Sequence, residues 1–185
     1  MNLKPRNPEF ESAVRGVFAR QGLMEAFGVA IEELGPGACA LSVGFHGTKA
    51  KLQASIQGAL LGAMADTAAS LAALTLVPKG HGIVTVEYKV SFLEPALGDK
   101  VIARARVRRA GRNLTLAEAD TLAVEEDGSE TLCAVSMHTL MRLDPQGPPR
   151  GGAASSAGAG AEAPAPAEEA AGGKKKTKKK LFGRG

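Results

Sequence analysis

One helix-length segment of the chain, residues 56–78, is apolar on nearly every side and contains a single ionisable residue, Asp66. A helix that is apolar all round is normally buried on all sides, so the remaining elements have to wrap around this segment. A carboxylate buried without a partner is costly, and an acid in such surroundings is usually paired, protonated or functional. Asp66 is therefore the first candidate for a functional residue.

Strand-like segments lie on both sides of this helix in the sequence. The clearest runs from Ile83 to Leu93, where apolar and polar residues alternate with the period of two that a half-buried strand shows. Further strands are predicted at residues 28–34, 38–45, 100–109, 113–125 and 130–142. With a short helix after Pro8, these elements predict an α+β fold in which an antiparallel sheet of about six strands wraps round the central helix. Because one sheet covers one side of a helix, we expect a second subunit to cover the other.

The composition changes abruptly after residue 145. Residues 146–173 are almost entirely Gly, Ala, Pro, Ser and Glu, which cannot bury enough apolar surface to offset the entropy of ordering. A lysine cluster follows at residues 174–180, and the segment 146–185 holds eight basic and three acidic residues, so the basic character of the chain belongs to it. We predict one domain at residues 1–145 and a disordered linker with a Lys-rich tail at residues 146–185.

The Lys-rich tail has three interpretations. It is a solubilising extension that contacts nothing, a segment that binds acidic lipid surfaces, or a segment that touches nucleic acid without specificity. No aromatic or groove-reading element accompanies the basic run, so we expect no specific nucleic-acid partner.

Several classes of protein are not expected. No apolar run free of charge reaches the length of a membrane span, and the first residues lack the apolar run of a secretory signal, so a cytoplasmic location is expected. Cys39 and Cys133 have neither a metal-site spacing nor that of a disulfide framework. His46, His81 and His138 form no ligand cluster, so no metal or other cofactor is expected. His138, on the last strand, is interpreted as capping a polar face.

Three blocks of the sequence share a pattern with a known family. Gln57-Gly58-Ala59 opens the helix, and Met64-Ala65-Asp66-Thr67-Ala68 follows it after four residues. Residues 85–96 read Thr-Val-Glu-Tyr-Lys-Val-Ser-Phe-Leu-Glu-Pro-Ala, and residues 103–112 end in Arg-Ala-Gly-Arg. Together these blocks resemble the hotdog-fold acyl-CoA thioesterases, in particular the phenylacetic-acid-degradation (PaaI-like) type, over roughly residues 5 to 143.

The resemblance implies roles for five residues. Asp66 would activate water as a general base or attack the thioester directly. The N–H of Gly58 would polarise the thioester carbonyl, with Asp66 held beside the opening amides of a helix at a seam between two chains. Gln57 stands where the family has His and could take over its orienting role. Lys51 stands where the family has Asn or Gln and could pair with a carboxylate or a phosphate. Thr85 is expected near the acyl end of the substrate, reached from the partner subunit.

Further substrate contacts are expected from four more residues. Arg108, Arg109 and Arg112 could meet the phosphates of coenzyme A, because the guanidinium group matches the geometry of phosphate. Thr67, beside Asp66 in the sequence, could orient the substrate or could simply bond to a backbone carbonyl.

The leading hypothesis is a thioesterase that hydrolyses an acyl-CoA to a carboxylic acid and free coenzyme A, acting as a homodimer or homotetramer. An alternative is a hotdog protein that binds acyl-CoA without turnover, since Gln57 and Lys51 depart from the family pattern. A hotdog dehydratase is a third hypothesis, but the sequence does not reveal the His–acid pair that it needs. The acyl group itself is left open.

Overall fold

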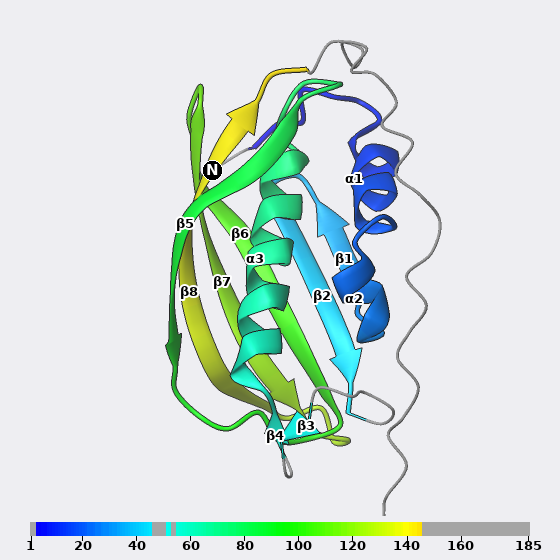
Figure 1. Cartoon of the computed structure of the whole chain (residues 1–185), viewed down its shortest axis with the longest axis vertical. Coiled ribbons are helices and arrows are strands. Elements are labelled where there is room, and N and C mark those ends of the chain that lie inside the picture. Colours follow the sequence, from blue (N-terminus) through cyan, green and yellow to red (C-terminus); the bar gives the residue numbers. More distant parts are fainter. Residues whose placement is uncertain (1–2, 46–50, 53–54, 146–185) are drawn as a thin grey trace, which may run out of the picture. The chain divides into compact units, whose positions relative to one another are not determined.

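The computed structural model of the chain describes residues 3–45, 51–52 and 55–145, and for residues 51–52 it describes the backbone alone. The linker and basic tail expected at residues 146–185 lie outside these residues. In the described part, one long helix, α3 (Gly58–Leu74), lies across one face of a curved antiparallel sheet (Figure 1). This arrangement confirms the predicted α+β hotdog fold.

Six strands form the sheet, in the order β1-β2-β6-β7-β8-β5, and every neighbouring pair is antiparallel. The strands are β1 (Ala30–Gly35), β2 (Ala38–Gly44), β5 (Gly82–Phe92), β6 (Lys100–Ala110), β7 (Leu114–Val124) and β8 (Glu130–Leu143). Their bounds agree with the predicted strands to within two residues. Register shifts interrupt several pairings, one of them between Thr85 and Glu87 of β5, and such irregularities increase the bend of a sheet.

The central helix begins at Gly58, as predicted from Gln57-Gly58-Ala59, and ends four residues before Pro78, where its end was expected. Before it, β3 (Lys51–Leu52) pairs with β4 (Ser55–Ile56), a small hairpin that the sequence did not reveal. The helix ends at Leu74, ahead of Pro78, because the residue before a proline is disfavoured in helical conformation. Two short helices, α1 (Phe10–Phe18) and α2 (Gly22–Ala26), lie at the β1 side of the sheet in Figure 1, and α2 was not predicted.

Alanine lines both sides of the contact between α3 and the sheet. The helix contributes Ala65, Ala68, Ala69, Ala72 and Ala73, and the strands contribute Ala103, Ala105, Ala117, Ala119, Ala123 and Ala134, all of them buried. Side chains this small allow the helix to approach the sheet closely, and the dense packing fixes its axis and rotation. The position of every functional side chain on α3 is set in this way.

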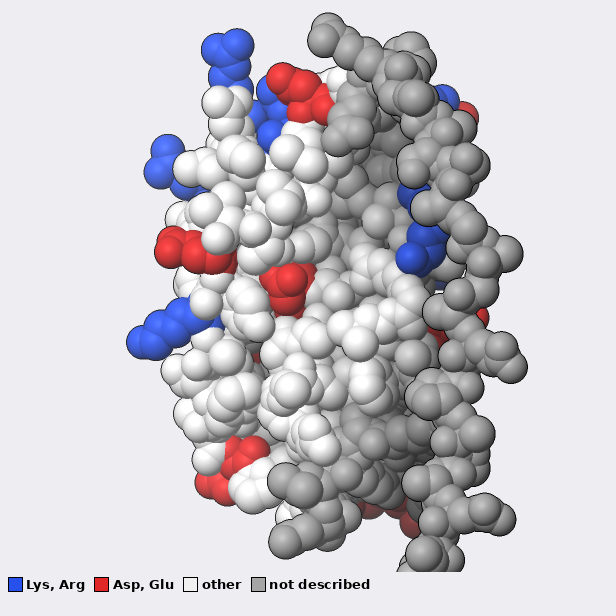
Figure 2. All heavy atoms as spheres, viewed as in Figure 1, with Lys and Arg blue, Asp and Glu red and all other residues white. Residues whose placement is uncertain are grey.

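A half-exposed stripe runs along the side of α3 that faces away from the sheet. It consists of Ala63, Asp66, Thr67, Ser70 and Leu74, which are spaced at three and four residues and therefore share one helical face. Figure 2 shows that the surface over α3 is mostly uncharged, while basic and acidic side chains project at the edge of the molecule along β5. A stripe of this kind is the surface that a second subunit was expected to cover.

Candidate functional site

Asp66 lies at the centre of the half-exposed stripe and is held by two side chains from the sheet. Its side chain is 31% exposed, so it is neither free in solvent nor sealed in the core. Thr85 of β5 donates a hydrogen bond of 2.7 Å from Oγ1 to Asp66 Oδ1. His138 of β8 places Nδ1 3.3 Å from the same oxygen. Both contacts engage Oδ1, and no described residue donates a hydrogen bond to Oδ2.

A chain of hydroxyl groups supports the carboxylate. Ser70 Oγ and Thr85 Oγ1 lie 3.2 Å apart. Because Thr85 has a single hydroxyl proton and donates it to Asp66, Ser70 must be the donor in this pair. The chain of hydrogen bonds from Ser70 to Thr85 to Asp66 therefore fixes the position of the carboxylate.

His138 is fully buried behind Asp66, which corrects the interpretation that it caps a polar face. Its side chain is 0% exposed, and its ring stacks on Tyr88 with centroids 5.2 Å apart and 15° between the planes. Nε2 lies 2.8 Å from Ser136 Oγ, and Ser136 in turn donates to the carbonyl oxygen of Ala119 at 3.2 Å. The imidazole is therefore held from three sides and presents one edge to the acid.

The hydrogen bonds around His138 assign its protons. Ser136 has already donated its hydroxyl proton to Ala119, so it can only accept from Nε2, and Nε2 must carry a hydrogen. Nδ1 is buried and has no hydrogen-bond partner, although Asp66 Oδ1 lies 3.3 Å away. Nδ1 therefore faces the carboxylate of Asp66 directly, with the rest of the imidazole ring enclosed by the core.

Asp66 lines a groove of about 500 Å³ between α1, α3 and the start of β5. Val17, Leu71, Leu74, Ile83 and Val84 make its apolar wall, and the polar side chains Gln21, Thr67, Ser70, His81 and Thr85 also line it. Thr67 donates to Gln21 Oε1 at 3.4 Å across the groove, so it meets neither Asp66 nor a backbone carbonyl. A groove with both apolar and hydrogen-bonding groups beside an acid is suited to a small organic substrate.

Gly58 and Asp66 do not meet within one chain. Gly58 is the first residue of α3, and eight residues at the helical rise place it about 12 Å from Asp66 along the axis. No described residue accepts the N–H of Gly58, as is usual in the first turn of a helix. Gln57 is exposed and makes no side-chain cap to the helix. The expected site, with Asp66 beside the opening amide of the helix, can therefore form only if the acid and the amide come from different chains.

Of the other predicted binding residues, the structure brings Thr85 to Asp66 and places the three arginines away from it. Thr85, expected to be reached from the partner subunit, instead bonds to Asp66 of its own chain. Arg108 is paired with Glu118 at 3.2 Å on β7, and Arg109 is exposed on the same strand, β6. Arg112 lines a different pocket, near the end of α3. Lys51 belongs to β3, but its side chain is outside the described part of the chain.

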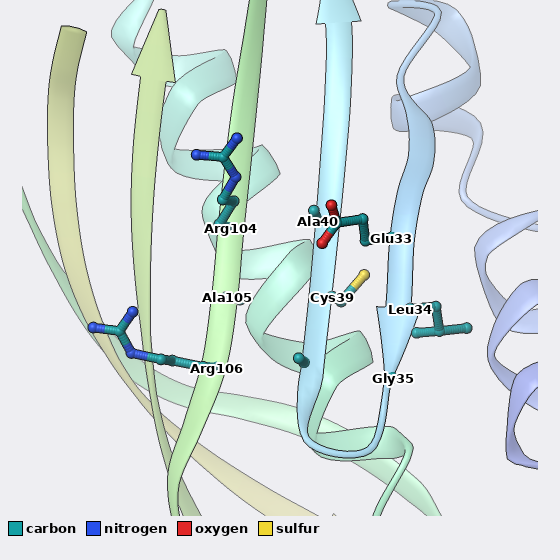
Figure 3. Close-up of a pocket in the computed structure, with 9 residues that line it drawn as sticks. Glu33, Leu34, Gly35, Cys39, Ala40, Arg104, Ala105 and Arg106 are labelled. Carbon is teal, nitrogen blue, oxygen red and sulfur yellow. The ribbon is translucent and has the colours of Figure 1, made fainter. Parts of the chain in front are cut away.

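A second cavity, of about 330 Å³, lies on β1, β2 and β6 and does not include Asp66 (Figure 3). Burial raises the pKa of the Cys39 thiol in its wall to about 12, which keeps the thiol protonated and unreactive. Arg104 and Arg106 extend away from Cys39 in Figure 3, and each is paired with a glutamate, Glu130 and Glu118 respectively. Glu33, an exposed carboxylate, also lines this cavity, but the lining contains no histidine and its thiol stays protonated, so it does not form a pair of nucleophile and base.

The described residues contain neither a cluster of metal-ligand side chains nor a membrane-spanning helix. No three His, Cys, Asp or Glu side chains there come close enough together to hold a metal ion. In the same residues, no helix combines the length and the apolar character needed to cross a membrane.

Known proteins resemble this chain over most of the described domain. A family model described as the thioesterase superfamily matches residues 55–126. A protein of Halobacterium salinarum with a provisional esterase assignment is 31% identical over 102 residues, which are 52% of this chain and 67% of that protein. The structure of a thioesterase family protein from Silicibacter pomeroyi is 34% identical with a TM-score of 0.69, and the match covers 72% of this chain and 98% of that one. A phenylacetic acid degradation-related protein from Ralstonia eutropha is 25% identical with a TM-score of 0.59, covering 71% and 98% of the two chains.

The fold, the family match and these relatives agree. The chain belongs to the thioesterase superfamily, as a hotdog thioesterase of the PaaI-like type. It is therefore a thioester hydrolase. Membership defines the bond that is cleaved but not the molecule that carries it.

Proposed function

We propose that the protein hydrolyses acyl-CoA thioesters, with Asp66 as the catalytic acid–base group. The observation that carries the proposal is the asymmetry of the Asp66 carboxylate. Thr85 and His138 both hold Oδ1, while Oδ2 accepts no hydrogen bond from a described residue and belongs to a side chain that lines the groove. An oriented carboxylate with one free oxygen is what a general base needs in order to bind and deprotonate a water molecule.

The reaction follows from this arrangement. Water bound at Oδ2 transfers a proton to Asp66 while its oxygen attacks the carbonyl carbon of the thioester. The carbonyl oxygen becomes an oxyanion, which a preorganised N–H donor at a helix N-terminus stabilises. The carbon–sulfur bond then breaks, and the sulfur leaves as a thiolate that takes up the proton. In the second route, Oδ2 of Asp66 attacks the carbonyl carbon directly and the sulfur leaves as a thiolate. Water then hydrolyses the resulting mixed anhydride, which releases the carboxylic acid, regenerates Asp66 and supplies the proton of the thiol.

The oxyanion donor in this proposal is Gly58 of the partner subunit. β5 is an edge strand with four exposed apolar side chains, Val84, Val86, Tyr88 and Phe92, which are 39–55% exposed. An unpaired apolar edge is a ready site for pairing with another strand. Gly58 lies beside the Phe92 end of β5, and Asp66 lies beside Thr85 near its other end. Antiparallel pairing of β5 with its copy therefore brings the Gly58 of one chain toward the Asp66 of the other, which supports a homodimer.

Binding of acyl-CoA without turnover is the second candidate. It is favoured by Gln57, which is exposed and does not cap the helix in the described chain, so the position taken by the family's His has no visible orienting contact. The dehydratase hypothesis loses support, because the histidine beside Asp66 is fully buried and cannot reach a substrate.

Release of free thiol from a panel of short, medium-length and aromatic acyl-CoAs tests the proposal. We expect turnover of at least one class, and a loss of kcat of about 10²-fold or more in Asp66→Asn, as is usual when a general base is removed. Asp120→Asn, which changes a carboxylate of β7 outside the groove, is the matched control and should retain activity. Tight binding of acyl-CoA with no thiol release would favour the binding protein, and full activity in Asp66→Asn would rule out Asp66 as the catalytic acid.

A further inference from the structure

The groove beside Asp66 runs from the acid toward the C-terminal end of α3. Five residues of the helix line it, with Asp66 at one end and Leu74 at the other. Eight residues at the helical rise span about 12 Å. In Figure 1, α1 lies along the upper half of α3 and β5 begins at the upper end of the helix, and the groove lies among these three elements. A substrate whose carbonyl carbon lies at Asp66 can extend one of its two arms into this groove.

The hydroxyl groups that line the groove donate their protons within the chain. Thr67 donates to Gln21, Ser70 donates to Thr85, and Thr85 donates to Asp66. A hydroxyl group has one proton, so none of the three can donate to a ligand without losing its present partner. The amide carbonyl groups of a pantetheine arm would lose their hydrogen bonds to water on entering the groove, and these hydroxyl groups would not replace them.

The remaining lining of the groove is apolar. Its apolar side chains come from three elements, α1, α3 and β5, and they are Val17, Leu71, Leu74, Ile83 and Val84. Among the described residues that line the groove, none is a lysine or an arginine, and Asp66 is the one acidic residue. A phosphate-bearing arm therefore finds no counter-charge here, whereas an alkyl chain gains free energy by leaving water for such a wall. The arm of the substrate that suits the groove is the acyl chain.

We propose that the groove holds the acyl chain and that Leu74 limits its length, so that straight-chain acyl groups of medium length are the substrate class. This inference rests on the proposed acyl-CoA thioesterase activity. An extended alkyl chain advances about 1.25 Å per carbon, since its C–C bonds of about 1.5 Å zigzag, and about eight to ten carbons fill the distance from Asp66 to Leu74. The coenzyme A portion then extends from Asp66 in the opposite direction, out of the groove.

Kinetics across acyl chain length test the inference in the full-length protein. Thiol release is measured with butanoyl-, octanoyl- and dodecanoyl-CoA. We expect kcat/KM to rise about tenfold or more from butanoyl- to octanoyl-CoA, because each methylene group buried in the groove contributes up to about fourfold. We expect kcat/KM to fall again for dodecanoyl-CoA, because its chain is longer than the groove.

Two substitutions of Leu74, which is only partly buried, change the far end of the groove in opposite directions. Leu74→Phe fills this end and should lower kcat/KM for octanoyl-CoA about tenfold more than for butanoyl-CoA, because the ring excludes the last carbons of the longer chain. Leu74→Ala lengthens the groove and should move the preference toward dodecanoyl-CoA. Leu114→Phe is the matched control, since it makes the same exchange on β7 at a position that is 50% exposed and outside the groove, and it should leave the ratio between chain lengths unchanged.

The same change at every chain length in Leu74→Phe would overturn the inference and assign the groove to the pantetheine arm. Calorimetry with S-butyl- and S-octyl-coenzyme A, thioethers that cannot be hydrolysed, gives a readout that does not depend on turnover. We expect the octyl thioether to bind the wild-type protein about tenfold more tightly, and this advantage to be lost in Leu74→Phe. Thiol release without a binding advantage for the octyl thioether would overturn the inference and leave the proposed activity standing. If no thioester is hydrolysed but the octyl thioether still binds more tightly, the proposed activity fails and the acyl site stands.

Discussion

The N–H of Gly58, the proposed oxyanion donor, can be removed by a substitution that does not break α3. It occupies the first position of α3, where proline is well tolerated because the N–H there has no partner within the helix. The preceding residue, Gln57, has φ −63° and ψ 135°, an extended conformation that is compatible with a following proline. Gly58→Pro therefore deletes one N–H group and leaves the fold in place.

The expected cost of this substitution is a loss of kcat of about 10²-fold, or close to 3 kcal/mol in transition-state stabilisation. We take the low end of the range for oxyanion donors because Asp66, which would face Gly58 across the proposed dimer, has a side chain that is 31% exposed. Water that reaches such a site weakens electrostatic stabilisation. A Cβ at position 58 would lie 3.2 Å from Cε1 and Cζ of Phe92, a tight contact that the 54% exposed ring can relieve by moving.

Gly58→Ala is the matched control, since it adds the same Cβ and keeps the N–H. Thiol release from the best acyl-CoA of the panel is measured for both variants, and circular dichroism checks that both are folded. We expect the alanine variant to retain most of the wild-type kcat. Equal activity of the proline and alanine variants would refute the assignment of the Gly58 N–H as the oxyanion donor.

Three further predictions follow from the described contacts. Thr85→Val removes the 2.7 Å hydrogen bond to Asp66 and should lower kcat about tenfold, whereas Thr85→Ser should restore it; an unchanged kcat in Thr85→Val would show that the bond does not orient the acid. Burial raises the pKa of Cys39 from 9.0 to about 12, so the stability that its neutral thiol contributes is complete below pH 9 and is lost as the pH rises toward 12. At pH 8 the thiol of the native protein should therefore react slowly with a disulfide reagent, and the thiol of the unfolded protein should react quickly. Fast labelling of Cys39 in the native protein would contradict this. Removal of residues 146–185 should leave kcat unchanged and weaken binding to anionic vesicles at low salt, and equal vesicle binding with and without these residues would leave the tail without a membrane role.

The elements that could be predicted are those with a strong local pattern. The alternation from Ile83 to Leu93 corresponds to β5, and the apolar segment around Asp66 corresponds to α3. The two-residue strands β3 and β4 and the five-residue helix α2 have too few residues to establish a period, so no pattern could reveal them. The C-terminal end of α3 was misplaced because apolar residues continue beyond its last turn, at Leu76 and Val77.

The contact between His138 and Asp66 could not be read from either residue alone, since it joins the middle of α3 to the last strand. A signal was nonetheless present. Ala134, His138 and Leu140 lie at even positions of β8, and the apolar members of this set mark the face that is buried. The separation of Gly58 from Asp66 was also predictable, because eight residues of helix span about 12 Å. Pairing across chains, in contrast, depends on an edge strand whose position in the sheet only the structure reveals.

The most direct test of a site shared between two chains uses two inactive variants together. Asp66→Asn and Gly58→Pro are produced in one cell with different affinity tags, and the heterodimer is purified through both tags. In that heterodimer one site keeps both Asp66 and the opposing Gly58 amide while the other site loses both, so we expect about half of the wild-type thioesterase activity per dimer. A heterodimer no more active than either parent variant would contradict a site built from the acid of one chain and the helix amide of the other.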